Sequence, residues 1–179
     1  KVHDYFIRKS MDLLRPGGIL AVVTSKGTLD KNDSTVRKNL AEQADLLGAV
    51  RLPADSFGKS ANTAVTSDLL FFQKKAEPLM GEPIWTYTGL TEDMVPVNEY
   101  YLEHPEMMLG KMVWFEQFFG KDSKYTALVN EAEDFDLEKG ILDAVGELPK
   151  NCYEESIAEK KKEEQDVLVA SPEIPNYTF

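Results

Sequence analysis

The fold is decided by residues 13–73, which read LLRPGGILAVVTSKGTLDKNDSTVRKNLAEQADLLGAVRLPADSFGKSANTAVTSDLLFFQ. In order, this stretch predicts the end of a helix, a glycine turn, a strand, a helix, a second strand, a polar loop and a third strand. Strands that alternate with helices are typical of an open α/β sheet of the nucleotide-binding type. Three strands make only half of such a sheet. We therefore expect the second half of the fold, and half of an enzyme.

The hydrophobic pattern predicts the individual elements. A helix over residues 2–15 carries one apolar stripe, formed by Val2, Tyr5, Phe6, Leu13 and Leu14. The run at 19–24, ILAVVT, has no polar alternation, which predicts a parallel strand buried on both faces. Asp33 or Ser34 is expected to begin a helix that ends near residue 43. The next two strands are expected over residues 46–52 and 64–72.

Charge and proline replace the apolar strands at residues 74–78, where we place a boundary. The predicted parts are the sheet-forming residues 1–78, an acidic α+β extension over 79–150, and a charged linker or tail over 151–179. Within the extension, the pattern favours a short strand at 85–87, a helix at 97–103, a strand at 111–118 and a helix at 135–148 begun by Asp136. Four aromatic residues form either an interface or, as we favour, a small core: Trp114, Phe115, Phe118 and Phe119.

The composition excludes several classes of protein. No apolar run reaches the roughly 18 residues of a membrane span, and nothing resembles a signal sequence, so we expect a cytoplasmic protein. One cysteine, Cys152, and two histidines argue against a disulfide framework and against a metal site. Residues 1–78 hold twelve Lys/Arg and nine Asp/Glu, whereas residues 79–179 hold eight and twenty-two. This asymmetry identifies no partner by itself.

Candidate ligand contacts follow from the sheet, because ligands of open parallel sheets bind beyond the carboxyl ends of the strands. A small polar segment follows the first strand and either lines a site or is a plain turn: Thr24, Ser25 and Lys26. Its glycine spacing matches no phosphate loop. Arg51, inside the second strand, either lines the site or forms an ion pair with Asp55 or Asp68.

The loop after the second strand carries one large aromatic residue, Phe57, followed by Gly58, Lys59 and Ser60. Phe57 either plugs the end of the sheet or offers a face on which a base stacks. Such stacking contributes about 1–3 kcal/mol per base. Both interpretations stay open at the level of the residues.

A series of segments in this region resembles a known family. LRPGGILAVVTS, VRKNL, GAVRLP and FGKSANTAVTSDLLFF follow one another as in the later part of the adenine amino-methyltransferase domain of DNA methylases. The chain is similar to the modification subunits of type I restriction systems and to methylases fused to helicase-like proteins on mobile elements. The resemblance covers about residues 2–75 and is specific only as a series.

The resemblance implies the second half of a Rossmann-like methyltransferase sheet. Such enzymes bind S-adenosylmethionine, flip an adenine out of duplex DNA and methylate its exocyclic amine. It implies that Phe57 stacks on the flipped base, with Gly58, Lys59 and Ser60 as backbone or base contacts. Residues 97–110, VNEYYLEHPEMMLG, resemble a segment that precedes a helicase-like region in the mobile-element proteins.

Two motifs of the family are missing from the sequence. They are the glycine-rich cofactor loop and the Asn/Asp-Pro-Pro-aromatic segment that accepts the adenine amine. Both would lie upstream of Lys1, which is not a methionine, so we interpret the chain as part of a longer protein. We expect no catalytic residue within it, no S-adenosylmethionine binding and no methyl transfer by the chain alone. DNA, an upstream methylase half and a downstream helicase-like region are the predicted partners.

Two hypotheses follow. The chain is a fragment of an adenine methyltransferase, or it is a non-catalytic interaction module built on a methylase-like sheet. In either case the unpaired edge of the first strand would promote aggregation. We expect that edge to be covered by residues 79–150 or by a second copy of the chain.

Overall fold

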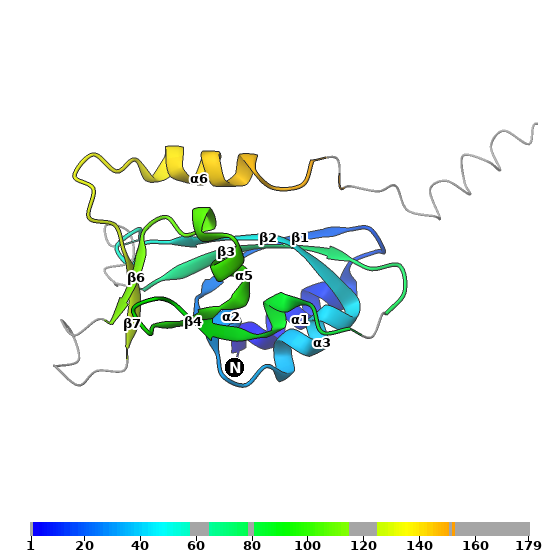
Figure 1. Ribbon diagram of the computed structural model, residues 1–179. Coiled ribbons are helices and arrows are strands. Elements are labelled where there is room, and N and C mark those ends of the chain that lie inside the picture. The colour runs from blue at the N-terminus through cyan, green and yellow to red at the C-terminus, as the bar shows by residue number, and fades with distance from the viewer. Residues whose placement is uncertain (1, 58–64, 79–80, 115–124, 151, 153–179) are drawn as a thin grey trace, which may run out of the picture.

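The computed structural model describes residues 2–57, 65–78, 81–114, 125–150 and 152. Its main sheet has the order β1-β3-β2, built from β1 (Ile19–Ser25), β2 (Ala44–Leu52) and β3 (Ser67–Lys74) (Figure 1). β3 runs antiparallel to both neighbours, so β1 and β2 point the same way on either side of it. The three predicted strands are confirmed as elements of a mixed α/β protein.

The prediction of parallel pairing is wrong. Neighbouring parallel strands need a crossover, usually a helix, whereas antiparallel neighbours can be joined by a direct return of the chain. The described part of residues 53–66 contains no helix, and β3 returns beside β2. An unbroken apolar run reports burial but not direction, so the sequence pattern could not distinguish the two arrangements.

Helices cover both faces of the sheet (Figure 1). α1 (Val2–Leu13) and α3 (Thr35–Gln43) lie on one face, and α6 (Leu137–Gly146) lies over the other. Ser34 is the N-cap of α3 but makes no capping bond with its side chain; instead the carboxylate of Asp33 accepts from the backbone N of Thr35 at 3.0 Å and from its hydroxyl at 2.6 Å. Asp136 begins α6, as predicted, by accepting from the backbone N of Lys139 at 3.1 Å.

α1 is apolar on two faces. Ile7 and Met11 are buried against the sheet. Of the predicted stripe, only Leu14 packs against the core, whereas four residues are between 61% and 76% exposed: Val2, Tyr5, Phe6 and Leu13. The spacing correctly predicts a helix. It does not identify the side of the helix that meets the core, because spacing alone does not distinguish between two apolar faces.

β1 is also less covered than predicted. Among the described residues it pairs only with β3, and Val23 is 57% exposed. The expectation of burial on both faces is therefore wrong for β1. The opposite edge of the sheet, along β2, is the one that the extension meets.

The extension contains two small antiparallel strand pairs, β4 (Thr88–Leu90) with β5 (Pro96–Asn98) and β6 (Lys111–Trp114) with β7 (Thr126–Val129). Its short helices are the 3-10 turns η1 (Ile84–Thr86) and η2 (Pro105–Met107) and the helix α5 (Glu99–Glu103); a four-residue helix, α2 (Gly27–Asp30), follows β1.

Three predictions for the extension need correction. Residues 84–86 form a 3-10 turn and not a strand, and the helix expected from residue 97 begins at Glu99, after a strand. Trp114 is 42% exposed and so is no core residue, whereas Phe115, Phe118 and Phe119 lie outside the described residues. The remainder of the strand predicted at 111–118 also lies outside them.

The extension packs against the sheet along β2. The backbone N of Leu109 donates to Arg51 O at 3.0 Å, and that of Ala54 donates to Leu128 O at 2.9 Å. One hydrophobic core draws residues from both parts of the chain, with the rings of Phe72 and Trp85 5.7 Å apart. The boundary near residue 78 stays a prediction. No described helix is long and apolar enough to cross a membrane.

Candidate functional site at the strand ends

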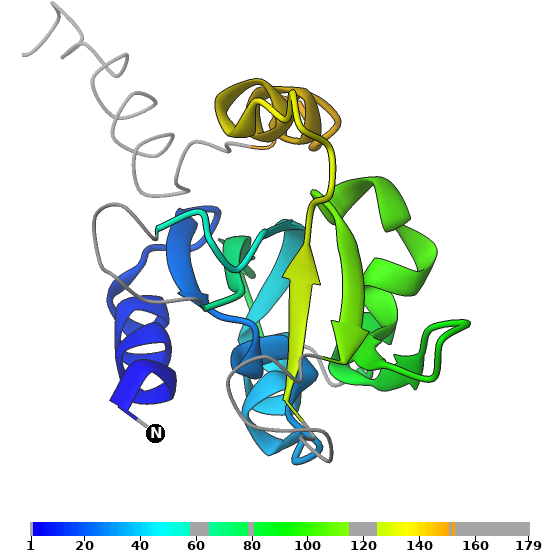
Figure 2. The same ribbon diagram turned by 90° about the vertical axis from the view of Figure 1, so that its left-hand side faces the viewer.

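The ends of the three main strands gather at one edge of the sheet. β1 and β2 end there and β3 begins there, so the register places Thr24, Asp68 and Arg51 side by side across the strands. The β6–β7 pair stands beside this edge (Figure 2). Residues from both parts of the chain therefore meet at the strand ends.

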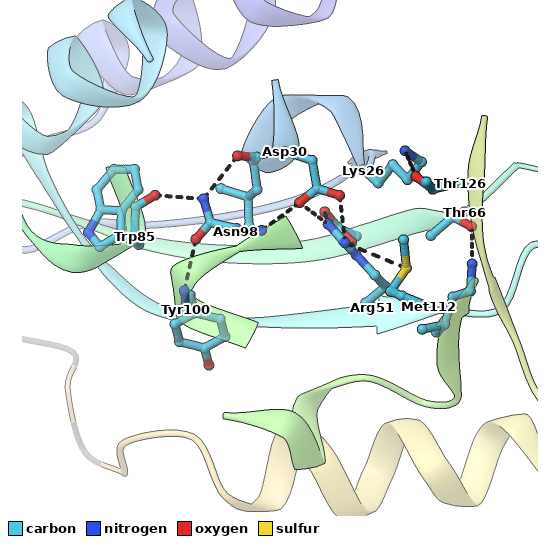
Figure 3. Close-up of polar contacts among 12 residues, drawn as sticks. Lys26, Asp30, Arg51, Thr66, Trp85, Asn98, Tyr100, Met112 and Thr126 are labelled. Carbon is cyan, nitrogen blue, oxygen red and sulfur yellow. Dashed lines mark hydrogen bonds and ion pairs between the residues drawn. The ribbon is translucent and has the colours of Figure 1, made fainter. Parts of the chain in front are cut away.

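Arg51 is fully buried and uses its side-chain donors within the protein (Figure 3). Nε and Nη2 donate to the two carboxylate oxygens of Asp68 at 2.7 and 2.9 Å. Nη1 and Nη2 donate to the two oxygens of Asp30 at 2.7 and 2.9 Å. Nη1 also lies 3.9 Å from the sulfur of Met112, and the guanidinium lies 4.2 Å from the ring centroid of Tyr101. Arg51 thus joins β2 to β3, α2 and the extension.

One guanidinium faces two carboxylates in this cluster, and burial raises the pKa of Asp68 above its ordinary value although Arg51 opposes the shift. Burial alone would lower the pKa of Arg51, but the Asp68 and Asp30 carboxylates outweigh it and hold the pKa well above its ordinary value. Burial raises the pKa of Tyr101, and the nearby Asp68 carboxylate raises it further, so the hydroxyl stays neutral. The predicted ion pair with Asp68 is confirmed, and Asp30 takes the place considered for Asp55. Any ligand contact by Arg51 would require one of these bonds to break.

Asp30 also connects the cluster to the extension. Its Oδ1 accepts a hydrogen bond from the backbone N of Asn98 at 2.9 Å. The Asn98 side-chain amide donates to Leu29 O and Trp85 O, both at 2.9 Å, and its oxygen accepts from the backbone N of Tyr100 at 3.0 Å. One buried asparagine therefore begins α5 and fastens it to α2.

Lys26 lies at the same edge, directly after β1. Its Nζ donates to the Thr126 hydroxyl at 2.8 Å and lies 5.5 Å from the ring centroid of Tyr125. Its backbone N donates to Thr66 O at 3.1 Å. Burial lowers the pKa of Lys26, and the more distant Asp30 carboxylate opposes this shift. The side chain bridges the end of β1 and the start of β7.

The structure gathers part of the predicted site. Thr24 is buried, with its hydroxyl 2.8 Å from that of Thr28, while Ser25 and Lys26 are half-buried. Phe57 closes the turn after β2 and is 36% exposed. Gly58, Lys59 and Ser60 lie outside the described residues. The ligand contacts of all these residues stay predictions.

Sequence reasoning missed Asp30, Asn98 and Thr126. Asn98 had a usable signal, since an asparagine directly before a helical segment is a common N-cap. Asp30 and Thr126 had none, because the contacts they make join residues 21 and 100 positions apart.

The described residues do not fit S-adenosylmethionine, the cofactor that the resemblance implies. At the strand ends, the Arg51 side chain is committed to Asp68 and Asp30, and Asp30 also accepts from the backbone N of Asn98. A cavity of about 370 Å³ lies along α1, away from the strand ends, and charged side chains dominate its lining. Cofactor pockets of this size are usually mostly apolar. Among the described residues, no group of three or more His, Cys, Asp and Glu side chains could hold a metal ion.

Comparison with known proteins places the chain in a family. A family model described as N-6 DNA methylase matches residues 2–139, well over half of the chain. The chain belongs to the N-6 DNA methylase family. The resemblance stated from the motif series is confirmed, and the match runs beyond residue 75 through β4–β7. The extension therefore lies largely within the residues that the family model matches.

One curated relative is a much longer protein, of which the chain matches only a small part. The chain is 28% identical over 120 residues to Defense against restriction protein B of Escherichia phage P1. The match covers 64% of this chain but 5% of that protein's length. No solved structure matches the chain.

Proposed function

We propose that the chain is the later part of an adenine-specific DNA methyltransferase domain with a Rossmann-like sheet. The complete domain would transfer a methyl group from S-adenosylmethionine to the exocyclic amine of adenine in DNA. This chain would supply the adenine-side wall, with Phe57 stacking on the flipped base and Gly58, Lys59 and Ser60 beside it. Cofactor and amine-binding motifs would come from an upstream half of the same polypeptide. The predicted cytoplasmic location and downstream helicase-like region belong to this proposal as well.

The proposal rests on the side of the sheet along β1, which the described residues leave exposed. Val23 of β1 and Phe6 of α1 line one cavity, the ring of Tyr5 lies 5.7 Å from that of Phe6, and all three side chains are more than half exposed. An apolar cavity of about 170 Å³ lies between α1 and β1. A helix that is apolar on two faces is typical of a buried position, and an unpaired strand edge is typical of a sheet that continues. Further strands and a helix from upstream residues would bury both features.

The first experiment separates the incomplete enzyme from the non-catalytic module. S-adenosylmethionine is titrated by calorimetry into this chain and into the chain extended upstream by roughly 150 residues, the usual size of a domain. Binding by the extended protein alone supports the proposal. Binding by neither favours the interaction module, and binding by the short chain overturns the missing-motif argument.

A matched pair of substitutions tests the proposed occupant of the open side. Phe6→Glu and Leu142→Glu both charge an exposed apolar side chain, 61% exposed on α1 and 64% exposed on α6. In the chain alone, both variants should unfold within about 0.5 kcal/mol of the parent, as surface changes usually do. In the extended protein, only Phe6→Glu should be strongly destabilising, because it would bury an unpaired charge.

Other outcomes identify other occupants. Equal and small effects of the two substitutions in the extended protein would contradict an upstream partner at this face. A dimer of the short chain that Phe6→Glu dissociates, seen by sedimentation, would instead show that a second copy covers it.

A further inference from the structure

Lys26 differs from three of the lysines whose contacts the structure defines, whereas Lys74, like Lys26, has no carboxylate partner among the described residues and donates to Met11 O at 2.7 Å. Lys38 meets Glu82 at 2.7 Å, Lys111 meets Asp93 at 2.7 Å and Lys75 meets Asp45 at 3.3 Å. Lys26 is more buried than Lys38 or Lys111, yet its only close side-chain partners in the described part of the chain are a hydroxyl and an aromatic ring. A partly desolvated ammonium without a carboxylate partner is unfavourable by itself.

The position of Lys26 is fixed from two sides. Its backbone N is bonded to Thr66 O, and the Thr66 hydroxyl accepts a hydrogen bond from the backbone N of Leu128 at 2.8 Å. Leu128 O in turn accepts from the backbone N of Ala54. β7 is thereby attached to the segment that precedes β3 and to the segment that follows β2. The ammonium is held at the strand ends before any ligand arrives, which lowers the entropy that binding has to overcome.

The chemistry of the position matches a phosphate. An ammonium has three N–H donors, and one of those of Lys26 is used by Thr126. Lysine binds phosphate as a point charge, and contacts with the DNA backbone position a protein without reading sequence. Phe57, the proposed stacking residue, follows the turn that begins at the carboxyl end of β2, on the same edge of the sheet.

We propose that Lys26 and the start of β7 form a contact point for a DNA backbone phosphate, so that the β6–β7 pair of the extension is one wall of the DNA site. This inference rests on the proposed function and assigns a role to the extension within it. Thr126 is the positioning residue, because its hydroxyl holds the ammonium. Lys26 is the residue that meets the phosphate.

The test is an NMR titration of this chain, and of the upstream-extended protein, with a 12-base-pair DNA duplex at several low salt concentrations. Lys26→Met removes the charge, and Thr126→Val removes only the hydroxyl that orients it. Lys139→Met is the matched control, since Lys139 is an exposed lysine on α6 and loses the same charge. Inorganic phosphate at the same phosphate concentration separates DNA binding from general anion binding.

We expect the duplex to shift the amide signals of Lys26, Thr66 and Thr126. Lys26→Met should weaken binding about tenfold, as for one charge-assisted contact. It should also lower the slope of log K against log salt by about 1. Thr126→Val should weaken binding with an unchanged slope, and Lys139→Met should change neither. Inorganic phosphate should bind more weakly than the duplex.

Three results would overturn the inference. If Lys26→Met binds the duplex as Lys139→Met does, Lys26 meets no phosphate and the proposed function stands without it. If inorganic phosphate shifts the same signals as strongly as the duplex, the position is a general anion site. If neither the chain nor the extended protein binds duplex DNA, the inference and the proposed function fail together.

Discussion

Replacing Arg51 with methionine should be among the most damaging single changes in the described part of the chain. Arg51→Met keeps an unbranched stem that reaches as far as the position of Nε but removes the guanidinium, whose charge is shared by two carboxylates. Asp68 has no exposed side-chain surface and Asp30 has 6%. Neither carboxylate can regain water without opening the fold.

The size of the effect follows from this burial. Removing one partner of a buried ion pair typically destabilises a protein by about 3–5 kcal/mol, because the remaining charge is uncompensated. Here one guanidinium serves two carboxylates through four hydrogen bonds of 2.7–2.9 Å. We therefore expect about 4–5 kcal/mol, which is a large part of the usual 5–15 kcal/mol stability of a domain.

The assay is urea unfolding followed by circular dichroism, with the parent chain and each variant at the same concentration. The free energy of unfolding should fall while the dependence on urea, which reports the surface exposed, stays constant. The double variant Arg51→Met, Asp68→Leu is the control. It removes the fully buried carboxylate together with its partner, so it should be more stable than Arg51→Met by at least about 2 kcal/mol. The reasoning is refuted if Arg51→Met costs less than about 1 kcal/mol, or if the double variant is no more stable than the single one.

Three further results are expected. Asn98→Ala should lower the free energy of unfolding by about 2–4 kcal/mol in the same assay, since it leaves two buried carbonyls and one buried N–H without partners; a loss below 1 kcal/mol would contradict the role of Asn98 as a link. Gly110→Ala should destabilise the protein by about 1–3 kcal/mol because the new Cβ would lie 2.5 Å from Val129 O. Gly146→Ala has nothing within 4 Å of the new Cβ and should stabilise α6 by about 0.5–1 kcal/mol. Equal effects of the two substitutions would show that β7 can move away from residue 110. Burial lowers the pKa of Lys26 in the folded state only, so the unfolded chain binds more protons at a pH between the folded and unfolded pKa values. The free energy of unfolding should therefore rise with pH through that alkaline window. Lys26→Met should remove this rise, and an unchanged pH profile would argue against burial of the ammonium.

The sequence pattern contained the elements of the sheet but not their arrangement. Strands and helices were predictable because the apolar runs are long and end at clear signals, such as Pro16 and Asp136. The direction of β3 was not, because burial and direction are independent properties of an apolar run. The inward face of α1 was not either, since both Ile7 and Phe6 lie on plausible faces.

For the candidate site, local chemistry was predictable and distant pairing was not. A strand arginine requires a counter-ion, which predicted Asp55 or Asp68 as the partner, and the β2–β3 register places Asp68 directly beside Arg51. The second partner, Asp30, belongs to a different element, and nothing in its local sequence marks it. Lys26 was singled out by its place after a strand, but its attachment to Thr126 depends on how residues 100 positions later fold back.

The link through Asp30 has a consequence for how such a protein can change over time. The backbone of Asn98 and the guanidinium of Arg51 share one carboxylate, so Asp30 is one of the side chains at which the two parts of the chain must match. A gene exchange that brought in a foreign segment from residue 79 onward would inherit Asp30 from one parent and Asn98 from the other. We expect compatible hybrids to keep both residues, or to have replaced them together, so that these distant positions are inherited as one unit.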